Sequence, residues 1–299
     1  MSDKTKSFLK IGKIPYANLF PVYHCLEKGN KHSIYRFING VPSSLNKMLR
    51  DGKLDVSPSS SIEYLRHKDK YSIIPWFSVS SDGPVGSIFL FSKLPIEALD
   101  KKTIAVSSHS ETSVALLKIV LKDFLSLHCK FRKVKGGSSK KNLKSFSACL
   151  FIGDEAMREA KKIRAQSTEH RLQKIKNLSS ESVTYIYDLG ELWFKHTGLP
   201  FVFALWIVRK KSLSQKRELI KELFLDLIAA KRYASKKFSL IARHAPQRKW
   251  LSAKELINYW KGISYDFTDK HMEGLRLFEE YALKKKTKIK IQNSKLRNL

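Results

Sequence analysis

Strand and helix signals alternate along most of this 299-residue chain. Short runs rich in β-branched and aromatic residues, such as 34–38 and 103–106, are each followed by a segment with apolar residues at helical spacing. Leu45, Met48 and Leu49 form one such amphipathic stripe. Repeated strand-then-helix units predict an α/β architecture with mostly parallel sheets.

Two blocks of this kind follow one another, and each predicts a small α/β lobe. Segments 92–95 and 200–203 are the expected crossings between the lobes. Two crossings make the first lobe discontinuous, with residues 1–94 and 203–299 in one lobe and 95–202 in the other. A cleft between two such lobes is a natural site for a small ligand. Residues 284–299 form a lysine-rich tail that we expect to be flexible.

The chain is strongly basic, with 57 Lys and Arg residues against 27 Asp and Glu residues and a formal net charge of +30. This balance permits nucleic acid, anionic lipid or a small acidic substrate as partner. The basic residues are spread over helices and the tail without an RRM, helix-turn-helix or zinc-finger signature, so we expect no specific nucleic-acid partner. The longest apolar run, 199–208, is half the length of about 20 residues that a bilayer requires, so we expect no membrane span.

The cysteines and the N-terminal segment indicate the compartment. Cys25, Cys129 and Cys149 are scattered without C-x-x-C spacing, which disfavours a disulfide framework or a structural zinc site. The first 20 residues lack an apolar stretch followed by a small-residue cleavage site, which disfavours a secretory signal. We therefore expect a cytoplasmic protein without a bound metal.

The common cofactor and hydrolase motifs are absent from the sequence: it has no G-x-G-x-x-G, G-x-x-x-x-G-K-[ST], H-E-x-x-H or G-x-S-x-G. This disfavours a nicotinamide or flavin cofactor on a Rossmann signature, P-loop chemistry, and zincin or α/β-hydrolase mechanisms. The nine histidines are dispersed, mostly in lysine-rich stretches typical of a solvated surface.

Hydroxyl- and amide-rich loops follow several predicted strands, at 14–21, 55–64, 80–87 and 107–114. The carboxyl ends of strands in open α/β sheets are where ligands bind, and a predicted helix begins after every one of these loops except 80–87. Exposed N–H groups at a helix N-terminus can hold a carboxylate without a formal cation. The pattern thus favours a small carboxylate ligand, although Ser and Asn are also ordinary helix caps.

Longer motifs give a more specific indication. In chain order they are GKIPYANLFP (12–21), NGVPSSLNKML (39–49), LDVSPSSSIEY (54–64), SSDGPVGS (80–87), FIGDEA (151–156), DLGELW (188–193) and YWKGISYDF (259–267). Together they resemble the chorismate dehydratase family of the futalosine route to menaquinone. The resemblance covers most of the chain, from residue 12 to about residue 281.

The resemblance implies a two-lobed periplasmic-binding-protein-like fold of type II, with a ligand cleft between the lobes. It implies a lyase that eliminates water from chorismate to give 3-[(1-carboxyvinyl)oxy]benzoate. A ring proton and the ring hydroxyl leave, and aromatisation drives the reaction. Such a reaction needs no redox cofactor, metal or added nucleophile, so we expect chorismate as the only small-molecule partner.

Two residues match the active-site positions of that family. Asn18 corresponds to its asparagine, whose amide would hydrogen-bond the departing hydroxyl or a substrate carboxylate; the alternative is a plain helix N-cap. Ser87 corresponds to its serine, which would donate to the leaving oxygen or to charge building on the ring carboxylate; the alternative is a strand serine facing solvent.

A second group would bind the substrate rather than act in the elimination. The substrate carboxylates are expected to bind four hydroxyl residues, with helix capping as the alternative: Ser60, Ser61, Thr112 and Ser113. Asp154 is expected to orient the cleft or stabilise the second lobe. Asp154 is given no chemical role. Asp82 is interpreted as a turn-forming residue.

The matched loops contain almost no group whose ordinary pKa suits a general base near neutrality, and His109 is the nearest candidate. We therefore expect a carboxylate of the substrate itself to act as the base while the protein supplies positioning. Two alternatives stay open: an enzyme like 1,4-dihydroxy-6-naphthoate synthase, and a non-catalytic protein that binds small carboxylates. The 80–87 and 188–206 stretches favour the dehydratase over the synthase.

Overall fold

The computed structural model describes residues 7–29, 33–107, 110–134, 139–173 and 184–284. It divides the chain into a first unit, Met1–Ser81 with Leu199–Leu299, and a second unit, Asp82–Gly198. The boundaries between the two lobes that the sequence predicts lie later, after residues 94 and 202. They fall earlier because β5 (Ile88–Ser92) pairs with strands of the second unit and β10 (Phe201–Arg209) with strands of the first. Apart from Lys284, the predicted basic tail lies outside the described residues.

The first unit contains a five-stranded sheet in the order β2-β1-β3-β10-β4. Its other strands are β1 (Leu9–Lys13), β2 (Tyr35–Asn39), β3 (Val56–Ser60) and β4 (Tyr71–Ser81). β1 runs parallel to β2 and β3, whereas β10 runs antiparallel to β3 and β4. The prediction of mostly parallel sheets is therefore wrong, because the strand that returns to this sheet after the second unit runs in the opposite direction.

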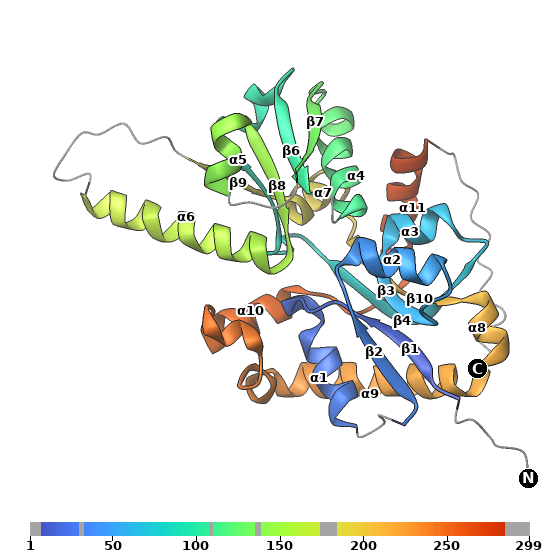
Figure 1. Cartoon of the computed structure of the whole chain (residues 1–299). Helices are drawn as coiled ribbons and strands as arrows, with labels where there is room; N and C mark the ends of the chain where they lie inside the picture. Colours follow the sequence, from blue (N-terminus) through green and yellow to red (C-terminus); the bar gives the residue numbers. More distant parts are fainter. Residues whose placement is uncertain (1–6, 30–32, 108–109, 135–138, 174–183, 285–299) are drawn as a thin grey trace, which may run out of the picture. The chain divides into compact units, whose positions relative to one another are not determined.

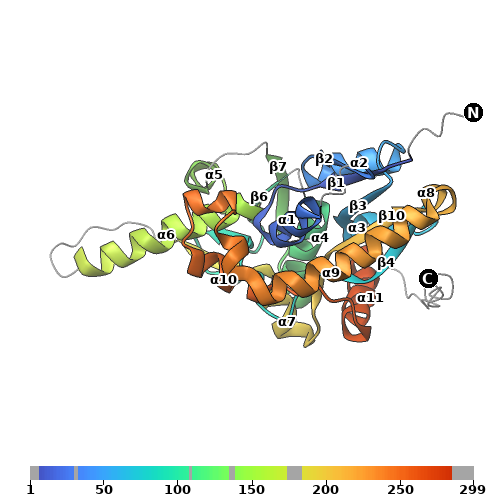
Figure 2. The same cartoon turned by 90° about the horizontal axis from the view of Figure 1, so that it is seen from below.

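Helices cover both faces of this sheet. α1 (Phe20–Lys28) and α9 (Arg217–Ala242) run side by side on one face, with α10 (Ala253–Gly262) against α9 (Figures 1 and 2). The other face carries α2 (Pro42–Arg50), α3 (Ser61–Arg66) and α11 (Asp269–Leu283), and α8 (Lys210–Gln215) follows β10 at the far end (Figure 1). The core between these layers includes the fully buried rings of Tyr23, Trp206 and Trp260.

The second unit has a sheet in the order β7-β6-β8-β5-β9. Its strands besides β5 are β6 (Thr103–Ser107), β7 (Lys130–Val134), β8 (Ala148–Ile152) and β9 (Tyr185–Asp188). β6 is parallel to β7 and β8, and β5 is antiparallel to β8 and β9. This sheet is mixed as well, so the expected parallel arrangement is also wrong here, because β5, the first strand of this unit, runs antiparallel to both of its neighbours.

Helices also flank the second sheet (Figure 1). α5 (Ser139–Ser145) and α6 (Gly153–Gln173) pack on one face over a cluster that includes Phe89, Phe91 and Phe151. α4 (Glu111–Ile119) and α7 (Leu189–Thr197) occupy the other face. The ring of Trp193 on α7 packs against Phe124, which ends the π-helical turn Val120–Phe124 after α4. Among the residues that the structure describes, no helix is long and apolar enough to cross a membrane.

Candidate active site

Asn18 lies directly after β1, inside the 3-10 turn Ala17–Leu19. The turn is fixed from two sides, because Trp260 Nε1 donates to the Ala17 carbonyl at 2.8 Å and the Tyr265 hydroxyl donates to the Asn18 carbonyl at 2.5 Å. The N-cap of α1 is Leu19, so the alternative of Asn18 as a plain N-cap is wrong.

The amide oxygen of Asn18 is buried and has no hydrogen-bond partner among the described residues. An unsatisfied buried polar atom costs about 1 to 3 kcal/mol. A donor on a bound molecule, such as a hydroxyl group, would remove that cost. The amide oxygen of Asn18 is therefore a candidate acceptor for a hydrogen bond from a ligand.

Ser60 and Ser61 lie at the carboxyl end of β3, where α3 begins. Asn46 Nδ2 donates to Ser60 Oγ at 3.0 Å, which leaves the hydroxyl hydrogen of Ser60 for another acceptor. Ser61 Oγ instead donates to the Val202 carbonyl, so Ser61 would have to break that bond before donating to a carboxylate. Of the two, Ser60 is the better candidate for binding an anion.

Ser87 is the last residue of a tight loop, residues 82–87, and directly precedes β5. Gly83 and Gly86 take φ values of +110° and +70°, which favour glycine, so the loop needs both. The Ser87 carbonyl accepts the N–H of Gly153 at 2.7 Å, and Ser87 is 3% exposed. The alternative of a strand serine facing solvent is therefore wrong.

Asp188 holds the same loop from the neighbouring strand β9. Its carboxylate accepts the N–H groups of Val85 and Gly86 at 3.0 and 2.7 Å, and also caps α7 through the N–H groups of Gly190 and Glu191. Burial raises the pKa of the Asp188 carboxyl above its ordinary value, and the four N–H groups act in the opposite direction. Sequence reasoning missed this residue; the DLGE pattern could have signalled a helix N-cap, but not the link to Gly86.

The remaining predicted residues of the second unit lie at the starts of two helices. Thr112 and Ser113 are buried in the first turn of α4, where Ser110 Oγ donates to Ser113 Oγ at 2.8 Å and accepts its N–H at 3.3 Å. Asp154 is the second residue of α6. His109 lies outside the described residues.

Within each unit, the predicted residues gather at one edge of the sheet. In the first unit, Asn18 and the two serines follow the carboxyl ends of the parallel strands β1 and β3. In the second, Ser87 precedes β5 beside the carboxyl end of β8, since Ile88 pairs with Ile152. Thr112, Ser113 and Asp154 follow β6 and β8 at that same edge. Open α/β sheets bind ligands at this edge.

Apart from the carboxylate of Asp154, these groups are hydroxyls, amides and backbone N–H groups, which orient anions and stabilise developing negative charge. In the described ranges, no group of three or more His, Cys, Asp or Glu side chains could hold a metal ion.

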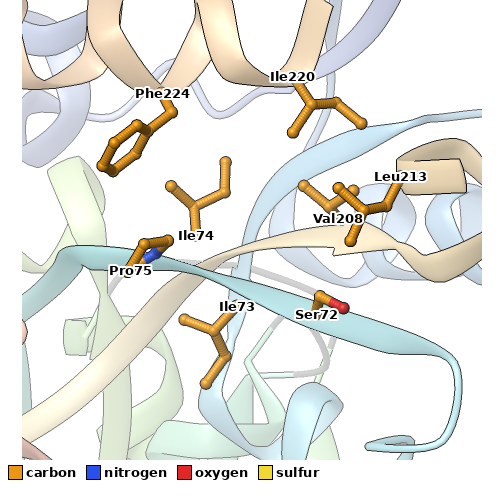
Figure 3. Close-up of a pocket in the computed structure, with 8 residues that line it drawn as sticks. All are labelled: Ser72, Ile73, Ile74, Pro75, Val208, Leu213, Ile220 and Phe224. Atoms are coloured by element: carbon orange, nitrogen blue, oxygen red, sulfur yellow. The ribbon is translucent and has the colours of Figure 1, made fainter. Parts of the chain in front are cut away.

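A separate apolar pocket lies in the first unit, between α9 and the strands β4 and β10. Ile220 and Phe224 project from α9, while Ile74 and Pro75 come from β4 (Figure 3). None of the side chains lining it is ionisable, and none belongs to a residue that the motifs singled out. It is therefore separate from the predicted site residues.

Comparison with solved structures shows the fold. A protein from Archaeoglobus fulgidus superposes with a TM-score of 0.70 over 94% of this chain and 98% of that chain, at 15% identity. A Candida albicans protein described as having the generic periplasmic binding protein fold superposes with a TM-score of 0.61 over 94% of this chain and 92% of that chain, at 13% identity. The chain thus has a two-unit α/β fold of the periplasmic-binding-protein type.

Comparison of sequences shows the family. The profile described as menaquinone biosynthesis matches residues 9–284. A protein from Thermus thermophilus named chorismate dehydratase is 30% identical over 272 residues, which span 90% of this chain and 93% of that protein. The chain therefore belongs to the menaquinone biosynthesis family.

Proposed function

We propose that this chain is a carbon–oxygen lyase, a hydro-lyase that converts chorismate to 3-[(1-carboxyvinyl)oxy]benzoate and water. The observation that carries the proposal is the match to the Thermus thermophilus protein named chorismate dehydratase, which extends over 90% of this chain. The polar residues at the sheet edges support it, because they offer neutral donors and acceptors to a small dicarboxylate.

Asn18 and Ser87 are assigned to the departing hydroxyl. The unpartnered Asn18 Oδ1 accepts the hydrogen of that hydroxyl and so fixes its orientation. Ser87 Oγ donates to the oxygen as negative charge builds on it during C–O cleavage. Preorganised donors of this kind act most strongly where water is excluded, and Ser87 is buried.

The carboxylates of the substrate are assigned to hydroxyl groups at helix starts. Ser60, Thr112 and Ser113 are the stronger candidates, and Ser61 contributes only if it releases Val202. Asp154 keeps an orienting role without chemistry. N–H groups of the first turn of α4 add to the attraction through the helix dipole.

The base is assigned to a carboxylate of chorismate itself. It takes the ring proton, the C–H electron pair becomes part of the aromatic ring, and the C–O bond breaks so that hydroxide, with that proton, leaves as water. The protein then needs only to hold the reacting groups in place, which can lower a barrier by about 7 to 11 kcal/mol in favourable cases.

The charge and the cysteines add two further elements to the proposal. A net charge of +30 attracts a dianion, and salt weakens that attraction. Cys25, Cys129 and Cys149 are all free thiols, which fits the reducing cytoplasm in which we place the reaction.

Product analysis tests the function. The purified full chain is mixed with chorismate, and the products are identified by mass spectrometry and by new aromatic absorbance. We expect 3-[(1-carboxyvinyl)oxy]benzoate in stoichiometric yield, and loss of turnover in Asn18→Ala and Ser87→Ala. Binding of chorismate without turnover would instead support a non-catalytic carboxylate binder. A protein that neither binds nor converts chorismate would overturn the proposal.

A further inference from the structure

The carboxylate of Asp188 joins two elements that are distant in sequence. Its Oδ1 accepts the N–H groups of Gly190 and Glu191, at 2.9 and 3.2 Å, and that of Val85 at 3.0 Å. Its Oδ2 accepts the N–H of Gly86 at 2.7 Å. Asp188 is 7% exposed, so these bonds form away from water.

The two oxygens differ in their partners: Oδ1 accepts N–H groups from both α7 and the 82–87 loop, whereas Oδ2 accepts only the N–H of Gly86. The cap of α7 uses Oδ1, and a serine, threonine or asparagine could supply an equivalent acceptor there. Oδ2 bonds to Gly86, which lies outside the helix. Only a carboxylate offers two acceptor oxygens with room for four N–H groups. Helix capping therefore accounts for two of the bonds to Oδ1, while Val85 on Oδ1 and Gly86 on Oδ2 belong to the 82–87 loop.

The bonded N–H groups immediately precede Ser87. Val85 and Gly86 are consecutive, and both N–H groups bond to Asp188; Gly86 takes a φ of +70°. On the other side, the Ser87 carbonyl is fixed by the N–H of Gly153. The register agrees, since Phe89 of β5 pairs with Asp188 of β9. The backbone on both sides of Ser87 is thus held by hydrogen bonds.

We propose that Asp188 is a positioning residue for the dehydration, which fixes the Val85–Gly86 backbone and through it the direction of the Ser87 hydroxyl. The inference rests on the proposed function and on the role of Ser87 within it. Asp188 itself touches no reacting atom. Its contribution is the orientation of a donor, where a displacement of about 1 Å can cost about 100-fold in rate.

Asp188→Asn separates the two roles of this side chain. The amide oxygen keeps the cap of α7, because asparagine caps helices as well as aspartate. The amide nitrogen replaces Oδ2 and presents hydrogens to the Gly86 N–H, so that bond is lost. We expect kcat to fall by about 10- to 100-fold, with KM changed by less than about threefold.

Glu159→Gln is the matched control in the same unit. Glu159 is also a buried carboxylate, and it accepts the Ser139 N–H at 3.0 Å and the Ser139 hydroxyl at 2.6 Å. It holds α5 rather than the 82–87 loop. We expect this variant to lower the melting temperature as much as Asp188→Asn does, while kcat stays within about twofold of the parent.

A double variant distinguishes positioning from general destabilisation. If Asp188 acts through Ser87, adding Asp188→Asn to Ser87→Ala lowers kcat by less than about threefold further, because the group being oriented is already absent. If the two effects multiply, or if Asp188→Asn alone keeps the parent kcat, the inference is overturned. Should Asp188→Asn not fold, Asp188→Ser is put through the same cycle, since serine caps the helix and cannot reach Gly86 as well.

The failure of the proposed function gives a different result. If the parent protein does not convert chorismate, the function itself is wrong and no variant is needed to show it. If the parent converts chorismate and Ser87→Ala is as active as the parent, the function stands and the positioning role of Asp188 falls.

Discussion

Trp260 donates its indole N–H to the backbone carbonyl of Ala17 at 2.8 Å, across 243 residues of sequence. Ala17 begins the 3-10 turn that contains Asn18, and Trp260 lies on α10 near the other end of the chain. The rings of Phe20 and Phe238 pack against the same indole, with centroids 6.2 and 5.5 Å away. The C-terminal helices of the first unit thereby fix the turn Ala17–Leu19, which follows the first strand of that unit.

Trp260→Phe tests this relationship. Phenylalanine keeps the aromatic packing but removes the N–H donor and part of the buried ring, so we expect a loss of about 1 to 3 kcal/mol in unfolding free energy. Because the turn that carries Asn18 loses a restraint, kcat is also expected to fall. Urea unfolding and steady-state kinetics measure the two effects. A destabilised variant with the parent kcat would show that this hydrogen bond does not orient Asn18.

Asn18→Ala should separate activity from stability. The amide oxygen has no partner among the residues described, so removing it deletes an unsatisfied buried atom rather than a hydrogen bond. We expect kcat to fall by about 100-fold or more, as for other single groups that stabilise a transition state. The melting temperature should stay the same or rise. A large drop in melting temperature would mean that Asn18 supports the fold instead.

The sequence predicted the α/β class and the residues at the sheet edges, but it did not predict the extent of individual strands. The serine-rich segment 55–64 predicts a loop, whereas β3 spans Val56–Ser60 within it. The run Ser-Pro-Ser-Ser has low strand propensity, and Pro58 has no N–H to donate. It is extended because β10 pairs along it, with Trp206 opposite Pro58. Such pairing with a distant strand overrides local propensity.

Dependence on distant strand pairing also explains why the sequence did not reveal the role of Asp188. Asn18 and Ser87 were identified because each lies within one continuous sequence motif that is sufficient to identify it. The function of Asp188 depends on Gly86, 102 residues earlier in the chain, and on a carboxylate oxygen that helix capping does not use. Neither is visible in the DLGELW motif by itself. Strand order brought the two segments together, through the pairing of β5 with β9.

His109→Ala tests the assignment of the base. If a carboxylate of the substrate removes the ring proton, this variant keeps kcat within about twofold of the parent, while Ser87→Ala loses activity. Steady-state kinetics on both variants, with circular dichroism to confirm folding, provide the comparison. Loss of activity in a folded His109→Ala protein would assign the base to the enzyme.

The last prediction concerns stability rather than catalysis. Asp55 precedes β3, at the edge of the first sheet opposite to Asn18. Its carboxylate accepts the Lys10 N–H at 2.9 Å, the Ser212 hydroxyl at 2.7 Å and Lys216 Nζ at 2.8 Å. Burial opposes its ionisation, but these partners outweigh burial and hold the pKa of Asp55 below its ordinary value.

A lowered pKa fixes the sign of the pH dependence. The ionised Asp55 stabilises the folded state above the unfolded-state pKa of about 3.9, and this contribution is lost as the pH falls through the folded-state pKa. Asp55→Asn should therefore cost about 2 kcal/mol at neutral pH, less than the loss of a partner from a fully buried ion pair. The difference from the parent should shrink as the pH falls below about 4.

Urea unfolding at a series of pH values measures this difference. Asp51→Asn is the control, since Asp51 pairs with Lys47 at 2.7 Å on the exposed surface and its loss should leave the unfolding curve unchanged. Both variants should keep the parent kcat, because neither residue belongs to the candidate site. A gap between Asp55→Asn and the parent that stays constant from neutral to acidic pH would show that the ionised carboxylate is not its source, and would assign the loss to packing around Ser212.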